Sequence, residues 1–312
     1  MNILVTGYKG FVGNALVGRL KKSGHKIIGL DYSEKPEESL KHKAHISVKG
    51  DVRDFDLLKK IIVEHEIEEI YHLASWAING VCANDPLTTF EVNLMGMVNI
   101  LEVCRNYGKN VKNVIISTSD KAFGASKVPY TEENELKPLF TYDTSKACQQ
   151  LIALGYFRNY DVPIKIVACS NIYGPGDLHF SRVIPATINR LLKGQPARLW
   201  ADSEGHVREF VYIDDVINAF LIVAQKGEHG GVYCCGGTEY LAIKELMVKI
   251  CLIMKKNPKK EIKVFNRPVF MKELAEQYID ASKIGKLGWK PKVSLTEGLK
   301  ETIKFHKKLL RK

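Results

Sequence analysis

The stretch Asn2–Gly13, NILVTGYKGFVG, determines the fold that the sequence predicts. It begins with an unbroken apolar run typical of a buried strand, and glycines follow at positions 7, 10 and 13. A helical pattern then extends from Gly10 to Lys22. Glycines at this spacing permit a tight turn and let an anionic group approach the backbone N–H groups of the helix N-terminus. The stretch therefore predicts a first strand and helix joined by an anion-binding turn.

The segments that follow repeat this alternation of strand and helix. We expect strands at 26–31, 68–74, 113–118 and 164–169 and helices at 56–65, 92–105 and 142–158. Strands that alternate with helices indicate an α/β fold with a doubly wound parallel sheet of the Rossmann type. Such sheets bind their ligands beyond the carboxyl ends of the strands.

The nature of the expected cofactor follows from Asp31, which ends the next strand 18 residues beyond Gly13. A carboxylate there can accept hydrogen bonds from an adenosine ribose and would repel a 2′-phosphate, which favours NAD over NADP. Asp51 and Val52 follow a third apparent strand and are expected beside the adenine.

The chain is expected to divide near Asn171. We predict an NAD-binding Rossmann domain over 1–170 and a smaller, mainly substrate-binding region over 171–312. Glycine and proline cluster in NIYGPGD after residue 170, and a helix is predicted near 184–192. Segments near 205–225, within REFVYIDDVINAFLIVAQ, are expected to return to the main sheet.

The composition of the 312 residues restricts the possible functions. The formal charge of +11 is concentrated at 255–263 and in the C-terminal tail, without interleaved aromatic residues, so nucleic acid is not an expected partner. No run of about 18 apolar residues predicts a transmembrane helix, and the N-terminus is typical of a strand, not of a signal peptide. The seven cysteines lack metal-ligand spacing, which predicts no metal site and a reduced, cytoplasmic setting.

Tyr142 and Lys146 form a second candidate cluster, in TYDTSKAC. A separation of four residues places both side chains on one face of a helix. An ammonium group near a phenol stabilises the phenolate and lowers its pKa, so Tyr142 could act as the base for a sugar hydroxyl.

These motifs together resemble the extended short-chain dehydrogenases/reductases that act on nucleotide sugars. The resemblance rests on TGYKGFVG, HLA at 72–74, Asn93, STSDKAFG and YDTSK, followed in order by NIYGPGD, REFVYIDDV and DASKIGKLGWKP. It implies an enzyme that retains NAD, in which Tyr142 deprotonates a hexose hydroxyl, Lys146 also holds the nicotinamide ribose and Ser119 bonds to the reacting oxygen. The further cofactor-binding residues expected on this basis are Phe11, Val12, Leu73, Ala74, Ser75 and Asn93. His72 is expected to be a satisfied polar group at a strand end.

The adjacent Asp120 and Lys121 distinguish subclasses of this family. Relatives that only epimerise carry small residues here, whereas 4,6-dehydratases carry a proton-shuttling pair. The pair is Asp-Glu in dTDP-glucose dehydratases and Asp-Lys in both CDP-glucose 4,6-dehydratases and inverting UDP-N-acetylglucosamine dehydratases. Tyr142 lies 21 residues after Lys121, which resembles the CDP-glucose enzymes, because the inverting dehydratases place their Tyr closer to the Lys. Elimination of water needs an acid for the departing carbon-6 hydroxyl and a base for the carbon-5 proton. The resemblance therefore implies a 4,6-dehydratase similar to the CDP-glucose enzymes, with the nucleotide base and the sugar left open.

The expected substrate is a nucleotide-diphosphate sugar. Guanidinium groups match phosphate oxygens well, and Arg208 and Arg267 are the first candidates for the diphosphate, with Arg182 and Asn171 as further substrate contacts. The family also implies a homodimer, to which Ala147, Leu151 and Leu154 on the Tyr142 helix could contribute an apolar face.

Two alternatives stay open from the sequence. If Asp120 and Lys121 form only an ion pair at the rim, the protein would be a 4-epimerase or a 4-oxidising dehydrogenase without elimination. A dinucleotide-sensing or RNA-associated protein without catalysis is the third possibility, and the intact Ser119, Tyr142 and Lys146 argue against it.

Overall fold

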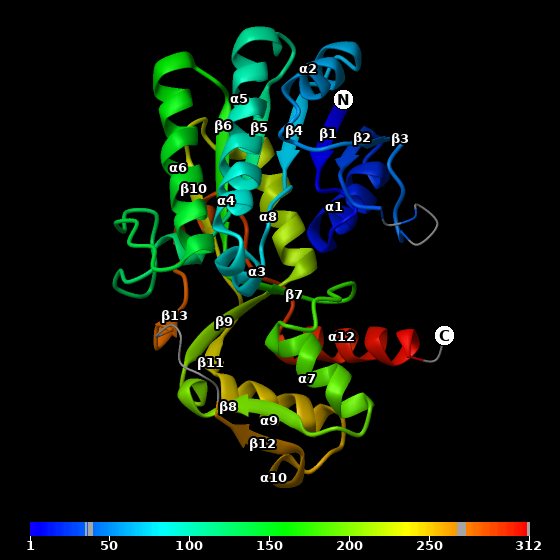
Figure 1. The fold of residues 1–312 in the computed structure, drawn as a ribbon, viewed down its shortest axis with the longest axis vertical. Coiled ribbons are helices and arrows are strands. Elements are labelled where there is room, and N and C mark those ends of the chain that lie inside the picture. The colour runs from blue at the N-terminus through cyan, green and yellow to red at the C-terminus, as the bar shows by residue number, and fades with distance from the viewer. Residues whose placement is uncertain (35, 37–39, 267–272, 311–312) are drawn as a thin grey trace.

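The computed structural model describes residues 1–34, 36, 40–266 and 273–310, and its largest element is a parallel sheet. Within these ranges the sheet has seven strands in the order β10-β6-β5-β4-β1-β2-β3 (Figure 1). The strands are β1 (Asn2–Thr6), β2 (Lys26–Asp31), β3 (Ile46–Lys49), β4 (Glu69–His72), β5 (Asn113–Ser119), β6 (Ile164–Cys169) and β10 (Val232–Cys235). The chain runs outward from β1 to β3, crosses back to β4 and continues to the other edge. This is the predicted Rossmann-type sheet, and the reversal lies between β1 and β4.

Helices cover both faces of the sheet. The helices α1 (Phe11–Lys22) and α8 (Ile213–Lys226) pack on one face, and α2 (Phe55–Glu64), α5 (Gly96–Tyr107) and α6 (Thr141–Tyr160) pack on the other. Strands buried on both faces need near-continuous apolar sequences. In β6 even Lys165 is buried, and its ammonium donates to the Ala224 carbonyl at 2.6 Å.

One continuous helical run, Pro86–Tyr107, has the length and apolar composition of a membrane-spanning segment. It consists of α4 (Pro86–Phe90), a π-helical turn (Glu91–Met95) and α5, and it follows the short helix α3 (Asn79–Asn84). Half of its apolar window is buried inside the protein, where α5 packs against α2 and α6. Packing in the core therefore accounts for its composition.

The remainder of the chain forms a smaller region beyond the carboxyl ends of the main strands (Figure 1). Its first sheet pairs β9 (Val207–Tyr212) with β7 (Asn171–Tyr173), β11 (Tyr240–Ala242) and β13 (Glu276–Gln277), and its second pairs β8 (Ala197–Trp200) with β12 (Ile262–Phe265). The helices of this region are α7 (Val183–Leu192), α9 (Ile243–Ile253), α10 (Pro258–Glu261), α11 (Ser282–Lys286) and α12 (Leu295–Leu309).

The segment 205–225 differs from its sequence-based expectation. Its strand, β9, does not join the main sheet, because its edges pair with β7, β11 and β13. Its helix, α8, does lie on the face of the main sheet, and the strand that extends this sheet is β10, which pairs with β6. An apolar run that ends in a helix is equally compatible with either sheet, so local sequence could not distinguish the two.

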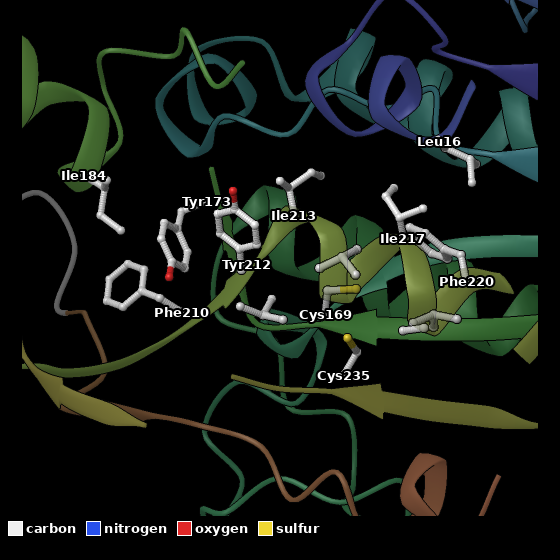
Figure 2. Close-up of a cluster of buried hydrophobic side chains, with 14 of the residues drawn as sticks. Leu16, Cys169, Tyr173, Ile184, Phe210, Tyr212, Ile213, Ile217, Phe220 and Cys235 are labelled. Carbon is white, nitrogen blue, oxygen red and sulfur yellow. The ribbon is translucent and has the colours of Figure 1, made fainter. Parts of the chain in front are cut away.

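The two parts of the protein meet where β9, whose aromatic rings pack against β7, leads into α8 (Figure 2). The Tyr173 ring lies edge-on to Phe210 and Tyr212, with ring centroids 6.4 and 5.6 Å away. Directly after Tyr212, Ile213 and Phe220 of α8 are buried in the core that also contains α1. The small region is thus held to the main sheet through the interior of the protein.

We predict that Phe220→Ala lowers the free energy of unfolding by about 3–5 kcal/mol, because a fully buried ring is replaced by a cavity. Leu252→Ala on α9 is the control, since that side chain is 60% exposed, and should change stability by less than about 1 kcal/mol. Urea denaturation followed by far-ultraviolet circular dichroism measures both. Equal effects of the two substitutions would contradict this account of the core.

Candidate active site

A cavity of about 1120 Å³ lies where the carboxyl ends of the main strands meet the smaller region. Its walls come from the glycine-rich turn after β1, the end of β5, the start of α6, β7, α7, β8 and β9. The predicted site residues that line it are Gly7, Gly10, Phe11, Val12, Gly13, Leu73, Ser75, Ser119, Asp120, Lys121, Tyr142, Lys146, Asn171, Arg182 and Arg208. Tertiary structure therefore brings the predicted cofactor, catalytic and substrate residues to one cavity.

The glycine-rich turn has the geometry of a nucleotide cradle. Gly7 has a φ of +70°, which side chains disfavour, and its N–H donates to the Leu30 carbonyl at 2.8 Å. A Cβ at position 13 would lie 2.7 Å from Tyr8 Cα and against the Gly7 carbonyl oxygen. The start of α1 can therefore approach the turn only because residue 13 is glycine. These residues fit a dinucleotide, whose pyrophosphate would lie at the N-terminus of α1.

Asp31 is held by backbone N–H groups at the end of β2. Its Oδ2 accepts from Lys9 and its Oδ1 accepts from Ser33, both at 2.9 Å, and the side chain is 7% exposed. The carboxylate is thus held beside the glycine-rich turn, where it would face an adenosine ribose and repel a 2′-phosphate.

The structure does not place every predicted cofactor residue on the cavity lining: Asp31, Asp51, Val52, Ala74 and Asn93 lie outside it. Asp51 pairs with Arg53 at 2.9 Å, and buried Val52 packs on the helix at Gly96. Burial raises the pKa of Asp51, but hydrogen bonds from Arg53 outweigh it and the net direction is down. The Ala74 N–H donates to Thr6 Oγ1 at 3.2 Å.

Asn93 links the segment after β4 to α6. Its Oδ1 accepts from the Ser75 hydroxyl and the Trp76 N–H, at 3.0 and 2.8 Å. Its Nδ2 donates to the Trp76 carbonyl and to Ser145 Oγ, at 3.0 and 2.9 Å. All of its side-chain polar atoms are used inside the protein, so Asn93 holds the cavity wall in position.

At the end of β5, the polar residues Ser119 and Asp120 are buried together. The Ser119 hydroxyl donates to Asp120 Oδ1 at 2.9 Å, and Asp120 is 1% exposed. Among the described residues Asp120 Oδ2 has no hydrogen-bond partner. Burial raises the pKa of Asp120, and Lys121 is the largest opposing influence. A carboxyl group with a raised pKa is suited to donate a proton.

Tyr142 and Lys146 lie one helical turn apart on α6. The Lys146 ammonium is 5.8 Å from the Tyr142 ring centroid and donates to the Ser117 carbonyl and to Gln149 Oε1, at 3.1 and 2.9 Å. Burial lowers the pKa of Lys146 to about 8. The expected lowering of the Tyr142 pKa is not seen, because burial of the phenol raises it. Without a bound ligand, the site therefore favours the neutral phenol.

Lys121 reaches across the cavity to the small region. Its ammonium donates to Oε1 of Gln277 in β13 at 3.4 Å, and its side chain is half-buried. This contact joins the end of β5 to a strand more than 150 residues later in the chain. Because of this contact, the environment of Lys121 is more than that of an ion pair with Asp120 at the rim of the cavity.

The predicted phosphate-binding arginines differ in their surroundings. The buried Arg208 guanidinium donates to the carbonyls of Val207, Leu274 and Ala275 at 2.9, 2.8 and 3.3 Å, and it pairs with Glu273 at 3.3 Å. These bonds hold the guanidinium in one position on the cavity wall.

Arg182 pairs with buried Asp177 at 3.2 Å. The Asn171 amide donates to the Glu209 carbonyl at 3.0 Å. Arg267 lies outside the described residues.

The sequence did not single out several residues that line the cavity, namely Asp143, Asp177, Arg198, Trp200 and Gln277. The Arg198 guanidinium lies beside both Trp200 and Phe265, 5.4 and 5.3 Å from their ring centroids. Asp143 follows Tyr142 directly, and this adjacency was a signal that sequence reasoning could have used. Gln277 had no such signal, because its strand has only two residues.

His72 is satisfied at only one ring nitrogen. Thr6 Oγ1 accepts from the N–H groups of Leu73 and Ala74, so its own O–H donates to His72 Nδ1 at 2.9 Å. Among the described residues His72 Nε2 has no partner. Burial lowers the pKa of His72 to about 3, so the ring is neutral at physiological pH.

Comparison with known protein families identifies the group to which this site belongs. The model of the NAD dependent epimerase/dehydratase family matches residues 3–236. The chain belongs to this family. The prediction of NAD from the glycine-rich turn and Asp31 is confirmed at the level of the family, as is the predicted resemblance to enzymes acting on nucleotide sugars.

Two curated relatives show the range of chemistry in the family. A trifunctional UDP-glucose 4,6-dehydratase/UDP-4-keto-6-deoxy-D-glucose 3,5-epimerase/UDP-4-keto-L-rhamnose-reductase of Arabidopsis thaliana is 29% identical over 98% of this chain. The match covers 47% of that relative, so the chain spans about half its length. A UDP-glucose 4-epimerase of Mycolicibacterium smegmatis is 30% identical over 98% of both chains.

The solved structures of the family have the same fold. The dTDP-glucose 4,6-dehydratase of Bacillus anthracis, crystallised in complex with NAD, superposes with a TM-score of 0.87. The match covers 99% of this chain and 97% of the other, at 28% identity.

We predict that Gly13→Ala raises the Kd for NAD at least about tenfold, because a Cβ there would displace the turn that approaches the pyrophosphate. Gly155→Ala on α6 is the control, since no atom lies within 4 Å of the added methyl group. Isothermal titration calorimetry with NAD measures both variants. Unchanged affinity of the Gly13 variant would show that the cofactor lies elsewhere.

Proposed function

We propose that the protein is an NAD-dependent nucleotide-sugar 4,6-dehydratase. The observation that carries the proposal is the placement of Asp120 and Lys121 in one cavity with Ser119, Tyr142 and Lys146. An enzyme that only oxidises or epimerises carbon-4 needs no second acid–base pair beside the first. Dehydratases among the relatives and solved structures support the same choice.

One group of residues acts at carbon-4 of the sugar, and the adjacent Asp120 and Lys121 act at carbons 5 and 6. Bound NAD supplies the hydride acceptor for carbon-4 and, later, the hydride donor for carbon-6. Tyr142 takes the proton of the carbon-4 hydroxyl, while Ser119 bonds to the same oxygen. Since burial raises the pKa of Tyr142, the positive charge that NAD brings on binding is needed to favour the phenolate.

Elimination then uses the adjacent pair. Once carbon-4 is a ketone, its carbon-5 proton is acidic. Lys121 takes this proton, and Asp120 gives its proton to the carbon-6 hydroxyl, which leaves as water. Burial raises the pKa of Asp120, which is the direction that a proton donor needs. Hydride would then return to carbon-6, Lys121 would return the proton to carbon-5, and the proton that Tyr142 took would restore that of Asp120. The product is a 4-keto-6-deoxy sugar nucleotide, one water lighter than the substrate, with no net change in NAD.

The diphosphate would bind Arg208 and Arg182, and Asn171 would contact the substrate nearby. The resemblance of the Asp-Lys pair makes a CDP-hexose our proposed substrate, and the relatives make UDP- and dTDP-glucose the alternatives to compare. We propose cytoplasmic activity, as expected from the free cysteines.

We further propose a homodimer formed through α5 and α6. The expected apolar face of α6 is divided, since Ala147 is buried and Leu154 packs on the core, whereas Leu151 is 61% exposed. Exposed apolar or aromatic side chains available for contact are Leu151 and Tyr160 on α6, with Met95 directly before α5 and Tyr107 at its end. Size-exclusion chromatography with light scattering of the wild-type protein and Leu151→Glu tests the dimer.

The first test is incubation with CDP-, UDP-, dTDP- and GDP-hexoses and mass spectrometry of the products. We expect a loss of 18 mass units, that is, one water, from at least one substrate and no accumulation of NADH. An isomer of unchanged mass would instead establish the 4-epimerase, which the Mycolicibacterium relative favours. Stoichiometric NADH would establish a 4-oxidising dehydrogenase.

The second test is Lys121→Met, which removes the proposed base and retains the length of the side chain. We expect kcat for water loss to fall at least about 100-fold, while a transient NADH signal from carbon-4 oxidation persists. Lys127→Met is the control, because Lys127 is exposed in the segment that follows. Full dehydratase activity of the Lys121 variant would assign the base to another group.

A further inference from the structure

Asp143 is a buried carboxyl group on the cavity wall that the proposed reaction does not use. It is the third residue of α6, directly after Tyr142, and it is 2% exposed. Lys121 and Phe140 line the cavity with it. Asp143 therefore lies at the part of the cavity where the carbon-4 and carbon-6 chemistry is placed.

Asp143 lies in the first turn of α6. Burial raises its pKa, and hydrogen bonds with the backbone of Phe140 and Leu139 lower it. Among the described residues Oδ1 has no hydrogen-bond partner, although it is buried. A buried acceptor without a donor is unfavourable, so a ligand that supplies the donor would bind more tightly.

The charged and titratable groups around Asp143 come from three elements. Lys121 lowers its pKa and Asp120 raises it, both from the turn after β5. Asp143 in turn raises the pKa values of Tyr130, in the loop before α6, and of Tyr142. The net effect of burial and these neighbours is a pKa of about 6 for Asp143. Above this pH the group is a carboxylate and can only accept hydrogen bonds.

The position of Asp143 identifies the part of the ligand that would supply the donor. The diphosphate offers no donor and would be repelled by a carboxylate. Asp143 directly follows the proposed carbon-4 base, Tyr142, on α6. A hexose hydroxyl is neutral and supplies a donor at this end of the cavity.

We propose that Asp143 is a sugar-binding residue whose Oδ1 accepts a hydrogen bond from a hydroxyl group of the hexose. This inference rests on the proposed function, because it takes the ligand to be a nucleotide-diphosphate hexose. Asp143 then contributes to sugar selection separately from the elimination chemistry of Asp120 and Lys121. It favours hexoses with a free hydroxyl group at this position over analogues that lack the donor.

The test compares the binding of a nucleotide-diphosphate hexose with that of the nucleotide diphosphate alone. The Kd for the nucleotide diphosphate divided by the Kd for the hexose isolates the contribution of the sugar. Both values are measured by calorimetry on the NAD-loaded protein. The hexose is the one turned over in the product assay, or UDP-glucose if none is turned over. Asp143→Leu should reduce this ratio about 10- to 100-fold and leave the Kd for the nucleotide diphosphate unchanged, because a charge-assisted hydrogen bond is lost.

Asp143→Asn distinguishes binding from a structural effect. The amide oxygen retains an acceptor in the same shape, so this variant should keep more of the ratio than the leucine variant. In the wild-type protein the ratio should fall as the pH decreases from 7.5 to 5, since the carboxylate is protonated, and in the asparagine variant it should stay constant. Asp214→Asn, an exposed carboxylate in the first turn of α8, is the matched control.

The outcomes separate this inference from the proposed function. If the hexose binds and loses water but the ratio is the same in the wild-type and leucine variants, the inference is wrong and the dehydratase stands. If no nucleotide sugar binds to the wild-type protein, both are overturned. A third outcome is that both Asp143 variants lose NAD binding or have a lowered Tm, while the leucine and asparagine variants have the same Kd ratio. This outcome would assign Asp143 to the stability of α6 and not to sugar binding.

Discussion

The position of β5 between β4 and β6 is the constraint on which the site depends. The register pairs Ile116 with His72, the last residue of β4, but β5 continues to Ser119, which pairs with Cys169 of β6. Residues 117 to 119 of β5 therefore extend past the end of β4. At these residues β5 pairs with β6 but not with β4. The end of β5 thus borders the space in which the cofactor and substrate are proposed to bind, and it directs Ser119 and Asp120 into the cavity.

The polar groups gathered there are unusually buried, and each has a different electrostatic consequence. Burial raises the pKa of Asp120 and of Tyr142 and lowers that of Lys146. All three shifts favour neutral groups, because the cavity wall removes water from them. A set of buried, neutral acid and base groups suits a reaction in which protons are transferred several times without exchange with bulk solvent. Binding of a cationic cofactor and an anionic substrate would then change the balance in the active complex.

Residues of the smaller region, which come much later in the chain than β5, also surround these polar groups. The aromatic contacts of Tyr173 with Phe210 and Tyr212 join β7 to β9, and α8, which follows β9 directly, is buried against the main sheet. Arg208 on β9 and Gln277 on the adjacent β13 then face the end of β5, where Gln277 accepts a hydrogen bond from Lys121. The proposed base is thus held between the two regions, so movement of β13 would change the surroundings of Lys121.

From local spacing, the sequence by itself predicted the parallel sheet, the glycine-rich turn and the Tyr142–Lys146 pair, because apolar runs form strands, glycines permit one turn, and four residues separate neighbours on a helix. The roles of Ser119, Asp120 and Lys121 were implied by the resemblance to a known family. Only the tertiary structure decided that β9 leaves the main sheet, that Gln277 meets Lys121 and that Asp143 has an unpartnered oxygen. Those features depend on contacts between distant segments and on burial, and neither is encoded by local spacing. The carboxylate beside Tyr142 was visible in the sequence, but its exclusion from water was not.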